Sequence, residues 1–440
     1  MLHRLAAFGV SLATLLLPFL IGCTTQNLAQ VVDVPGAPTN DGLTYYQSTA
    51  PIIAAKCATC HQPGGIAPFA LQTYADAKAH AAEIASAVQS RKMPPLPPQQ
   101  LGCQALDDDR NLSEDDRMNL FYWAQNGAAE GDAAHPAAIT LPVDVLGAPT
   151  VSVDSGIDYT STISGQDDYR CFVIDPQITS RFDLIAADTT STNRAIVHHV
   201  IVSAVPPASA AQAYANDNQD DGPGYECFGG VKVTGAYSVS ASAVGSPVKP
   251  FPDGTGVPLA AGTIFVVQVH YNFANGRGAN RLGLTLWKSP TPITRYPHGL
   301  SLSNVGFFIP AGAPDVEATA TGRFDTGAAG PGVTKPGRLW GVFPHMHQLG
   351  RSITVELERA DGTKACLMNI PAWDFHWQGS YQFVAPVVVN AGDKVTSTCV
   401  WDNSQDHQPM VNGVQQTTHD VRFGEGSGDE MCLTGLTLTD

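Results

Sequence analysis

The spacing of apolar residues changes about one third of the way along the chain. Over residues 76–90 and 113–126 the apolar positions recur at helical spacing, which predicts two amphipathic helices. The second begins with a serine followed by acidic residues, a typical helix start. Beyond residue 140 the pattern is that of strands, as in residues 195–202 and 264–271, which are rich in valine and isoleucine. We therefore expect a small α-helical domain followed by a mainly β remainder.

A continuous apolar run over residues 5–21 ends at Gly22, directly before Cys23. A run this short after a basic residue is typical of a secretory signal peptide, which we assign to residues 1–22. The four residues ending in Cys23 resemble the lipobox of bacterial lipoproteins. This implies an exported protein, acylated at Cys23 and held on the periplasmic or cell-surface side of the outer membrane. An ordinary signal peptide with a chance cysteine is the alternative. Residues 23–44 are polar and lack a hydrophobic period, so we expect a tether.

Composition sets broad limits on the fold and on the partners. The chain has 440 residues, of which 43% are hydrophobic and 15% charged, enough for two or three ordinary cores. Its 42 glycines and 32 prolines favour many short strands and turns. The formal net charge of −16 disfavours binding to nucleic acid and to anionic lipid head groups. We therefore expect no nucleic-acid partner, and membrane contact only through the N-terminal lipid.

Residues 57–61 read Cys-Ala-Thr-Cys-His. In a C-x-x-C-H motif the two thiols bond covalently to haem and the imidazole binds the iron. A thiol redox pair also uses C-x-x-C, but the histidine after the second cysteine and the exported context favour haem. We therefore predict one covalently bound haem c, held by Cys57, Cys60 and His61, in a cytochrome c-like domain over residues 45–135.

The sixth ligand of the haem iron has to come from elsewhere in this domain. We choose Met93, because the two prolines after it impose an extended backbone suited to a loop across the haem face. A thioether opposite a histidine also raises the reduction potential. Met118 and His80 are alternatives, but both fall in predicted helices, where such residues are usually packed or exposed.

Nine cysteines are present in a chain that we expect to be exported. With one assigned to lipid and two to haem, an even number remains, which predicts three disulfides in an oxidising compartment. Spacing does not decide the pairing within this set: Cys103, Cys171, Cys227, Cys366, Cys399 and Cys432.

Histidines interrupt the apolar strands at two places. His198 and His199 are adjacent, so they can share a metal only at a twist or bulge, or through different ring nitrogens. Taken alone, such a pair is more often one core and one surface histidine. His345 and His347 are two residues apart and project to the same face of a strand, which suits chelation of one ion. Taken alone, this second pattern fits zinc or no metal at all.

The order of these histidines, together with the end of the chain, carries a family resemblance. A His-His pair, then Gln-x-His-Tyr at 268–271, then His-x-His-x-Leu-Gly, then Asp-Glu-Met-Cys at 429–432 closely resembles the copper type II, ascorbate-dependent monooxygenases, which include the peptidylglycine and dopamine hydroxylases. The resemblance covers about residues 145–440 and implies two copper ions. Imidazoles suit both oxidation states of copper, and a thioether favours Cu(I). The implied ligands are His198, His199 and His270 for an electron-storing copper, and His345, His347 and Met431 for a catalytic copper.

The same resemblance implies the architecture. It predicts two antiparallel β-sandwich, jelly-roll-like domains, each donating one copper, which we place at residues 140–294 and 295–440. It also implies a disulfide between Cys399 and Cys432, and leaves three possible connectivities for the other four cysteines. Gln268 matches a family glutamine that lines the space between the metals. The alternative for this residue is a polar strand position facing solvent.

The sequence departs from the peptidylglycine hydroxylases where those enzymes grip a substrate carboxylate. They place an arginine two residues before the first histidine of H-x-H, and an asparagine and a tyrosine shortly after the ligand methionine. Here those positions hold Phe343, Leu433 and Gly435. A carboxylate would find no bidentate partner in such a pocket. We therefore expect a neutral or aromatic substrate.

Together these features predict a copper-dependent monooxygenase that hydroxylates an activated C–H bond of a small organic substrate with O2. Each turnover needs two electrons, which ascorbate supplies in the animal relatives. Here the fused haem, or another periplasmic donor, would replace or supplement ascorbate, because covalent attachment raises the effective concentration of the donor. The alternatives are a non-catalytic, copper- and haem-binding periplasmic electron carrier, and a purely structural β-sandwich lipoprotein with a cytochrome appended.

Overall fold

The computed structural model describes most of residues 42–440. Not described are residues 1–41 and the following positions: 64, 66, 96–97, 99–101, 108–111, 140–145, 166, 244–247, 253, 274–275, 327–331, 376, 412–413, 425 and 427. The predicted signal peptide, Cys23 and all but the end of the predicted tether lie outside the described residues. Among the helices that are described, none combines the length and the apolar character needed to cross a membrane.

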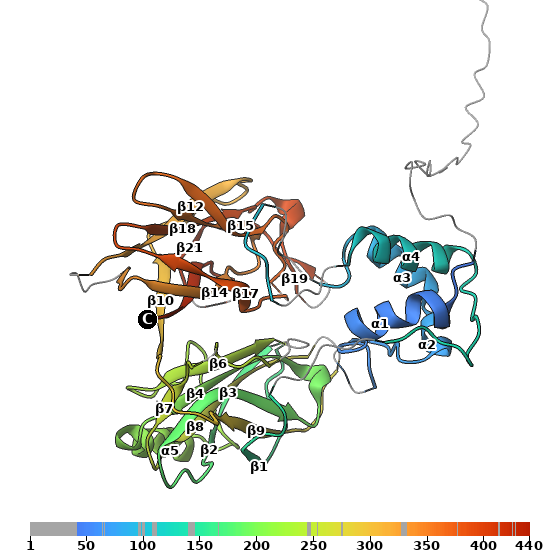
Figure 1. Cartoon of the computed structure of the whole chain (residues 1–440). Coiled ribbons are helices and arrows are strands. Elements are labelled where there is room, and N and C mark those ends of the chain that lie inside the picture. The colour runs from blue at the N-terminus through green and yellow to red at the C-terminus, as the bar shows by residue number, and fades with distance from the viewer. Residues whose placement is uncertain are drawn as a thin grey trace, which may run out of the picture. The chain divides into compact units, whose positions relative to one another are not determined.

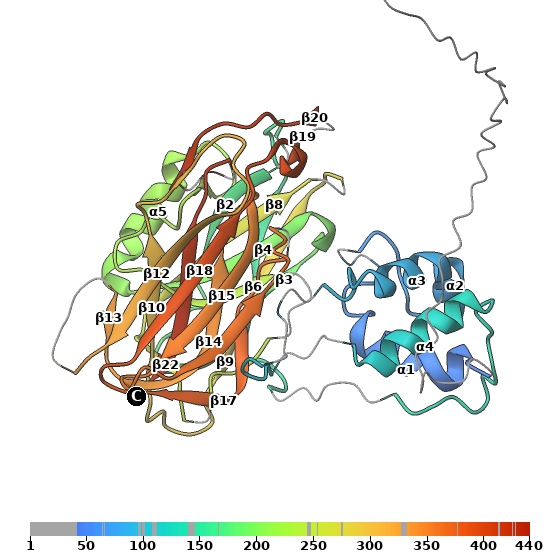
Figure 2. The ribbon, with the colours of Figure 1, turned by 90° about the horizontal axis from the view of Figure 1, so that it is seen from above.

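The first part of the chain folds into short helices, as Figures 1 and 2 show. These helices surround one apolar core. Leu120 and Trp123 of the last helix are fully buried in that core. The side chain of Ser113 caps the same helix by accepting a hydrogen bond from the Asp116 amide, 3.0 Å away. The elements are a π-helical turn (Tyr45–Thr49), α1 (Ala50–Lys56), α2 (Tyr74–Ala79), α3 (Ala81–Gln89) and α4 (Glu114–Gln125).

The helix expected over residues 76–90 is divided in two. Thr73 and Asp76 form a capping box that starts α2 two residues earlier than the apolar spacing indicates. His80 then leaves helical geometry, ends α2 and precedes α3. Its ring stacks on Phe69, with the ring centroids 3.8 Å apart. Because ring packing sets the backbone at this point, helical spacing alone could not predict the break.

The middle of the chain forms two antiparallel sheets that share one apolar core, which we call the first sheet pair. Their strands run in the order β1-β9-β3-β7 and β5-β2-β8-β4-β6. A short helix, α5 (Ala210–Gln219), contributes to a smaller adjoining core. The strands are β1 (Val151–Tyr159), β2 (Asp167–Ile174), β3 (Phe182–Ser191), β4 (Val197–Val205), β5 (Tyr225–Glu226), β6 (Tyr237–Ala243), β7 (Val257–Leu259), β8 (Ile264–Asn272) and β9 (Asn280–Lys288).

Strand β8 explains why the pattern over residues 264–271 is continuously apolar. It is the central strand of its sheet, and every residue from Ile264 to Tyr271 is buried. Phe265 and Val267 pack into the core between the two sheets, whereas Val266 packs into the smaller core beside α5. A strand covered on both faces has no polar side to alternate with. His270 therefore lies in a fully buried environment.

The C-terminal part forms a second sheet pair, whose strands are shown in Figure 1. The two sheets enclose a core of their own. Its sheets have the orders β10-β22-β14-β17 and β13-β12-β18-β15-β16, antiparallel except for β12 with β13. The strands are β10 (Pro297–Asn304), β11 (Phe308–Ile309), β12 (Val316–Phe324), β13 (Val333–Thr334), β14 (Gly337–His345), β15 (Gly350–Glu358), β16 (Lys364–Ile370), β17 (Tyr381–Val389), β18 (Lys394–Trp401), β19 (Met410–Val411), β20 (Val414–Gln415), β21 (Val421–Arg422) and β22 (Cys432–Thr439).

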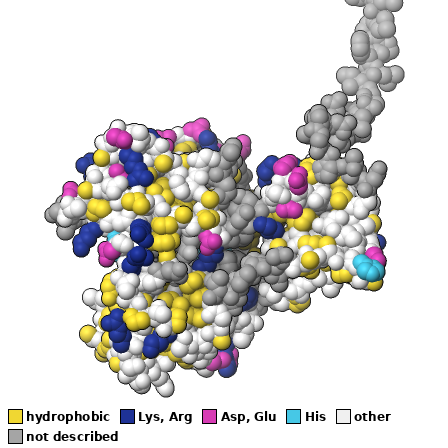
Figure 3. Space-filling model, viewed as in Figure 1, with side chains coloured by type: hydrophobic (Ala, Val, Ile, Leu, Met, Phe, Trp, Pro, Cys, Tyr) yellow, Lys and Arg dark blue, Asp and Glu magenta, His cyan; other side chains and the backbone are white. Residues whose placement is uncertain are grey.

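The expected mainly β composition with antiparallel sheets is confirmed. Three disulfides are present among the described residues, which is the number that the cysteine count predicts. They join Cys103 to Cys366, Cys171 to Cys227 and Cys399 to Cys432, so the pairing left open by the sequence is resolved. On the face shown in Figure 3, basic side chains are dispersed among acidic and apolar ones.

Candidate metal centres

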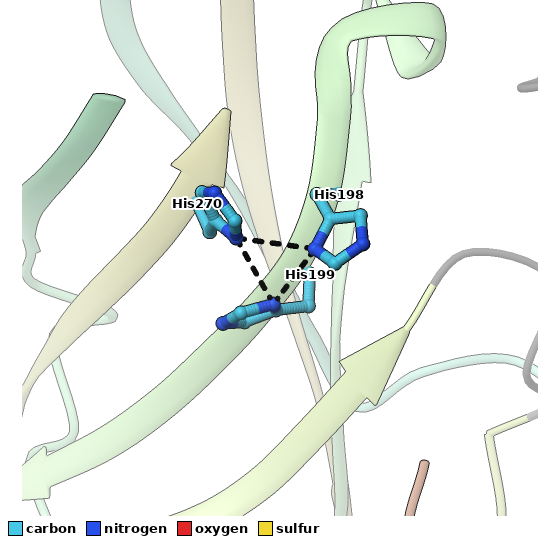
Figure 4. Close-up of side chains that lie close together, drawn as sticks. All are labelled: His198, His199 and His270. Atoms are coloured by element: carbon cyan, nitrogen blue, oxygen red, sulfur yellow. Dashed lines mark hydrogen bonds between the residues drawn. The ribbon is translucent and has the colours of Figure 1, made fainter. Parts of the chain in front are cut away.

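Three histidines of the first sheet pair bring one ring nitrogen each to a common point. The Nδ1 atom of His198 lies 3.2 Å from Nδ1 of His199 and 3.1 Å from Nδ1 of His270. The third separation, between His270 and His199, is 3.4 Å, and Figure 4 shows all three rings converging. Ligand nitrogens about 2 Å from one metal ion lie about 3–3.5 Å apart, so this spacing fits a three-coordinate metal site.

A bulge allows two adjacent histidines to share this point. The pairing of β4 with β8 shifts register between Val197 and His199, so His198 is the extra residue. A regular strand would send the side chains of His198 and His199 to opposite faces. The bulge turns both toward His270 on the neighbouring strand. The interpretation of one core and one surface histidine does not describe this geometry.

The far nitrogen of His270 is held by a carboxylate. Its Nε2–H donates to Oδ1 of Asp167 over 2.9 Å, and the Asn272 side-chain amide donates to the same oxygen over 2.8 Å. Asp167 and Asn272 face each other across the pairing of β2 with β8. The Tyr169 ring stacks on the His270 ring, with centroids 4.2 Å apart. This arrangement fixes both the tautomer and the orientation of the ring. The proton lies on Nε2, so the lone pair of Nδ1 faces the other two histidines.

The second histidine pair lies at the end of β14. His345 is the last residue of that strand and His347 follows it, with ring centroids 5.0 Å apart. Nδ1–H of His345 donates to Oε1 of Gln378, and Nδ1–H of His347 donates to the Asp429 carbonyl over 3.1 Å. Both rings therefore leave Nε2 for a metal, whereas the first group uses Nδ1.

Burial lowers the pKa of three of these imidazoles. It lowers the pKa of His345 to about 4, assisted by the neighbouring His347. Burial, and then the other two histidines of its group, holds the pKa of His199 well below its usual value. Burial also lowers the pKa of His347. A neutral imidazole offers its lone pair to a metal without first losing a proton, so the rings of His199, His345 and His347 can bind metal at neutral pH.

Glu430 ties Met431 to the His345–His347 turn. Its carboxylate is completely buried and accepts four hydrogen bonds, and burial raises its pKa to about 7. The adjacent Cys432 is bonded to Cys399 of β18, which anchors the chain on the other side of Met431. The donors to Glu430 are the amides of His347 (2.9 Å), Leu349 (2.7 Å) and Met431 (3.2 Å) and the Trp401 indole (2.8 Å).

One aromatic ring contacts both histidine groups. The Phe375 ring centroid lies 6.3 Å from that of His198 and 5.9 Å from that of His347. Phe375 belongs to the segment between β16 and β17, which also contains Gln378. In the same segment, the Trp373 indole donates to the His347 carbonyl over 3.0 Å. This segment therefore touches both histidines of the second pair and one of the first.

Three residues occupy the positions at which peptidylglycine hydroxylases bind a substrate carboxylate, and they lie near His345. The Phe343 ring is stacked with the His345 ring at a centroid distance of 6.1 Å. Across the β14–β22 ladder, Phe343 faces Gly435 and His345 faces Leu433. These three positions therefore supply an aromatic ring, an aliphatic side chain and no side chain next to the second histidine pair, with no cation among them.

Gln268 is buried, with only 6% of its surface exposed, so the interpretation of a solvent-facing strand residue is wrong. The reason is that β8 is covered on both faces. The side-chain amide of Gln268 donates to the Cys227 carbonyl over 2.8 Å. Its role beside the metals stays a prediction.

The C-x-x-C-H motif follows the end of α1. Neither Cys57 nor Cys60 forms a disulfide, and burial raises the pKa of the Cys57 thiol to about 12. A thiol redox pair needs a thiolate, so this environment disfavours that alternative. Nδ1–H of His61 donates to the Phe69 carbonyl over 3.0 Å, which leaves Nε2 for a haem iron.

The candidates for the sixth haem ligand lie in different surroundings. Met93 follows α3, is half-buried, and its amide donates to the Ala87 carbonyl over 3.3 Å. His80 stacks on Phe69, the residue whose carbonyl occupies the Nδ1 side of His61. Met118 lies in α4, where its sulfur accepts a hydrogen bond from Arg117.

One family model matches the C-terminal part of the chain. Residues 332–436 match the copper type II ascorbate-dependent monooxygenase, C-terminal domain. This part of the chain belongs to that family. The match includes His345, His347 and Met431, and it indicates a copper-dependent oxidoreductase of the monooxygenase type. The family description implies O2, ascorbate and a small substrate.

The other comparisons add little to the family match. The sequence matches none of the curated proteins. Solved structures with some likeness include an allantoicase (10% identity, 56% of this chain and 81% of that chain, TM-score 0.16), Broad Bean Stain Virus (11%, 70% and 94%, TM-score 0.25), and the infectious bursal disease virus VP2 subviral particle (10%, 70% and 74%, TM-score 0.19). TM-scores this low support no conclusion about fold or function.

Sequence reasoning missed the residues that orient the histidines. Asp167 and Gln378 reach His270 and His345 across strands and loops, and nothing in their local sequence marks them. Glu430 did carry a signal, because it stands inside the Asp-Glu-Met-Cys motif directly before the expected ligand. An acidic residue enclosed by a buried motif needs several donors, which could have indicated its structural role.

Proposed function

We propose that the protein is a two-copper monooxygenase that hydroxylates an activated C–H bond of a small neutral or aromatic substrate with O2. The observation that carries the proposal is the pair of pre-oriented imidazole groups. Three Nδ1 atoms converge in the first group, and two Nε2 atoms are left open in the second. The Glu430 carboxylate links the backbone amides of His347 and Met431 in that second group. The family match at residues 332–436 supports copper as the metal.

The donor atoms fit copper in both groups. The first group offers three imidazoles, and the second offers two together with a thioether, which zinc does not need. Copper bound there would supply one-electron redox chemistry and O2 activation, which side chains cannot. His198, His199 and His270 would hold the electron-storing ion. His345, His347 and Met431 would hold the ion at which O2 reacts.

The chain's own residues prepare these groups in two ways. Asp167 and Gln378 accept the outer N–H of a histidine in each group, so the inner nitrogen is presented without a proton. Burial also lowers the pKa of His199 and His345, which favours the neutral form of these two rings. The geometry therefore exists before metal arrives, which lowers the cost of ordering the site on binding.

The substrate class follows from the surroundings of His345. Phe343, Leu433 and Gly435 offer contact area for an apolar or aromatic group and no cation for a carboxylate. A charged substrate would lose its hydration without gaining a partner. A neutral molecule with an activated C–H bond suits these positions.

The helical segment would be a cytochrome c-like domain that delivers electrons. Cys57, Cys60 and His61 fit a haem c, because the thiols form no disulfide and Nδ1 of the histidine is already occupied. Met93 is the proposed sixth ligand. Haem would supply one electron at a time from a position covalently fixed to the copper domains. The two sheet pairs would be the two copper domains, and the protein would be exported and lipid-anchored through Cys23.

The proposal is tested by oxygen uptake and product analysis with the full-length, metal-loaded protein. A panel of neutral aromatic and aliphatic compounds is incubated with ascorbate and 18O2, and hydroxylated products are identified by mass spectrometry. We expect one 18O atom in the product for each O2 consumed, and loss of product in His345→Ala and Met431→Ala. Copper binding and reduction without O2-derived product across the panel would favour the non-catalytic electron carrier instead.

A further inference from the structure

A short piece of the helical region is built into the second sheet pair. Residues 102–107, which we call the anchor segment, lie in the chain between α3 and α4, but Leu106 is buried in the core of the second sheet pair. Its exposed fraction is 6%. The core formed by α1–α4 contains no residue of the anchor segment among those that the structure describes. This segment therefore packs away from the helices that precede and follow it.

The anchor segment pairs with the open edges of both sheets. Strand β16 ends one sheet of the second pair and β17 ends the other. Cys103 forms a bridge and a disulfide with Cys366 of β16, and Leu106 bridges to Phe383 of β17. An unpaired edge strand offers free backbone donors and acceptors, which an added segment can satisfy.

Backbone and side-chain contacts hold the rest of the segment. The Val384 amide donates to the Ala105 carbonyl over 2.9 Å, and the Asp107 amide donates to the Gln382 carbonyl over 2.8 Å. The Asp107 carboxylate also lies 2.6 Å from the Lys249 ammonium. A disulfide, two backbone hydrogen bonds, a buried leucine and an ion pair thus act within six residues.

The disulfide limits where the helices can go. Met93 and Ser113 each lie about ten residues from Cys103, a length of chain that spans at most about 35 Å. Met93, which follows α3, and Ser113, which caps α4, therefore stay within about 35 Å of Cys103, which is bonded to Cys366. This limit holds even if the chain between α4 and β1 is fully flexible. Strands β16 and β17 also flank the segment that carries Trp373 and Gln378, the residues that contact His347 and His345.

We propose that residues 102–107 dock the helical region permanently on the second sheet pair, at the two strands that flank the segment contacting His345 and His347. This inference rests on the proposed function only in treating the helical region as the haem carrier. A haem module attached there does not swing freely on a linker between α4 and β1. It stays at one edge of the domain that matches the monooxygenase family.

The covalent part is tested first on the full chain. A protease recognition site is inserted between Ala138 and Ile139, which are both exposed. After cleavage, we expect the two fragments to migrate together on a denaturing gel without reductant and to separate with it. The control is the same protein carrying Cys103→Ser and Cys366→Ser, whose fragments should separate in both lanes. Separation of the unreduced parent fragments would overturn the proposal.

The docking itself is tested by solution scattering. A released variant combines Cys103→Ser, Cys366→Ser and Leu106→Asp. The matched control keeps both cysteines and carries Ile139→Asp, at an apolar residue that is 50% exposed. We expect the radius of gyration to increase in the released variant and to stay unchanged in the control. Equal radii for the wild type and the released variant would overturn the proposal.

A second readout covers the case in which the released variant folds poorly. In Leu106→Ser with the disulfide intact, hydrogen exchange at the Val384 amide should become at least about tenfold faster. Exchange in β12, which makes no contact with the anchor segment in the described backbone pairings, should not change. Unchanged exchange at Val384 would contradict the docking.

Failure of this inference and failure of the proposed function give different results. A chain without the haem absorption band would remove the haem carrier but leave the disulfide and the scattering result intact. If the protein binds haem and two coppers but the wild type and the released variant have the same radius of gyration, the proposed function is retained and the docking is overturned.

Discussion

Nε2 of His270 lies 2.9 Å from Oδ1 of Asp167, and this contact points the opposite nitrogen of the ring at His198 and His199. A carboxylate behind a metal-binding histidine fixes its tautomer and raises its basicity. Asn272 donates to the same oxygen, so the carboxylate is itself held in place. Residues outside the first histidine group, Asp167 and Asn272, therefore orient the His270 ring within it.

Replacing Asp167 should weaken the first metal site without unfolding the sheet. We expect Asp167→Ala to reduce copper affinity at that site about 10–100-fold, because the His270 ring loses its acceptor. Asp167→Asn should have a smaller effect, since its amide oxygen can still accept. Competitive copper titration with EPR of each site measures the change. Asp183→Asn, on β3 in the other sheet of the pair and with Arg181 as its partner, is the control. Unaltered affinity in Asp167→Ala would contradict the positioning role.

Replacing Glu430 should affect the second site and the fold together. Glutamine offers one acceptor oxygen, and its NH2 group would face backbone amides that now donate to Glu430. We expect Glu430→Gln to lower the free energy of unfolding by about 1–3 kcal/mol and to loosen copper at His345, His347 and Met431. Urea unfolding and copper titration measure both effects. The exposed Glu317→Gln, on β12, serves as the control. A selective loss of copper at the first site would be inconsistent with the account.

A cation beside His345 should change substrate preference. Phe343→Arg places a guanidinium where carboxylate-binding relatives carry arginine, two residues before the first histidine of the pair. We expect the variant to bind carboxylate-containing aromatic compounds more tightly than their neutral analogues, reversing the order in the wild type. Binding is compared by calorimetry in the copper-loaded protein. Phe343→Leu is the control for lost aromatic area. An unchanged order of binding would place the substrate elsewhere.

An ion pair away from the metals gives a test in acid. Hydrogen bonding from Arg170 lowers the pKa of Asp220 to about 2. Because the pKa is depressed in the folded protein, the stabilisation is present above the unfolded value of 3.8 and is lost as the pH falls through about 2.

We therefore expect Asp220→Asn to be less stable than the wild type by about 1–2 kcal/mol at pH 7, with the difference shrinking toward pH 2. Urea unfolding at several pH values gives the comparison. Asp183→Asn, whose partner Arg181 is mostly exposed, should show a smaller difference. A difference for Asp220→Asn that stays constant with pH would exclude this ion pair as its source.

The strands and the terminal helix could be predicted because their signals are local. The continuous apolar run of β8 and the Ser113 cap each lie within one element. The division at His80 could not be predicted, because it depends on a ring stacking on Phe69. The anchor segment was assigned to the helical region by its position in the chain. Its pairing with β16 and β17 is a contact between distant residues that no local pattern encodes.

In the candidate site, too, features with a local sequence signal could be predicted, and features that depend on contacts between distant residues could not. The histidines that come together in each group could be chosen from the order of their motifs. The bulge that turns His198 toward His270 could only be stated as a requirement, because it depends on the register of β4 against β8. Asp167, Gln378 and Phe375 act across sheets or loops, so their roles depend on the fold.

The central claim is that two separate copper sites exist, one of which depends on a methionine. It is tested by metal analysis with optical and EPR spectra of the full-length protein and of Met431→Ala after copper loading. The account predicts two coppers and one haem c per chain in the wild type, and selective weakening of one copper site in the variant. One copper or none in the wild type, or equal loss at both sites in the variant, would contradict it.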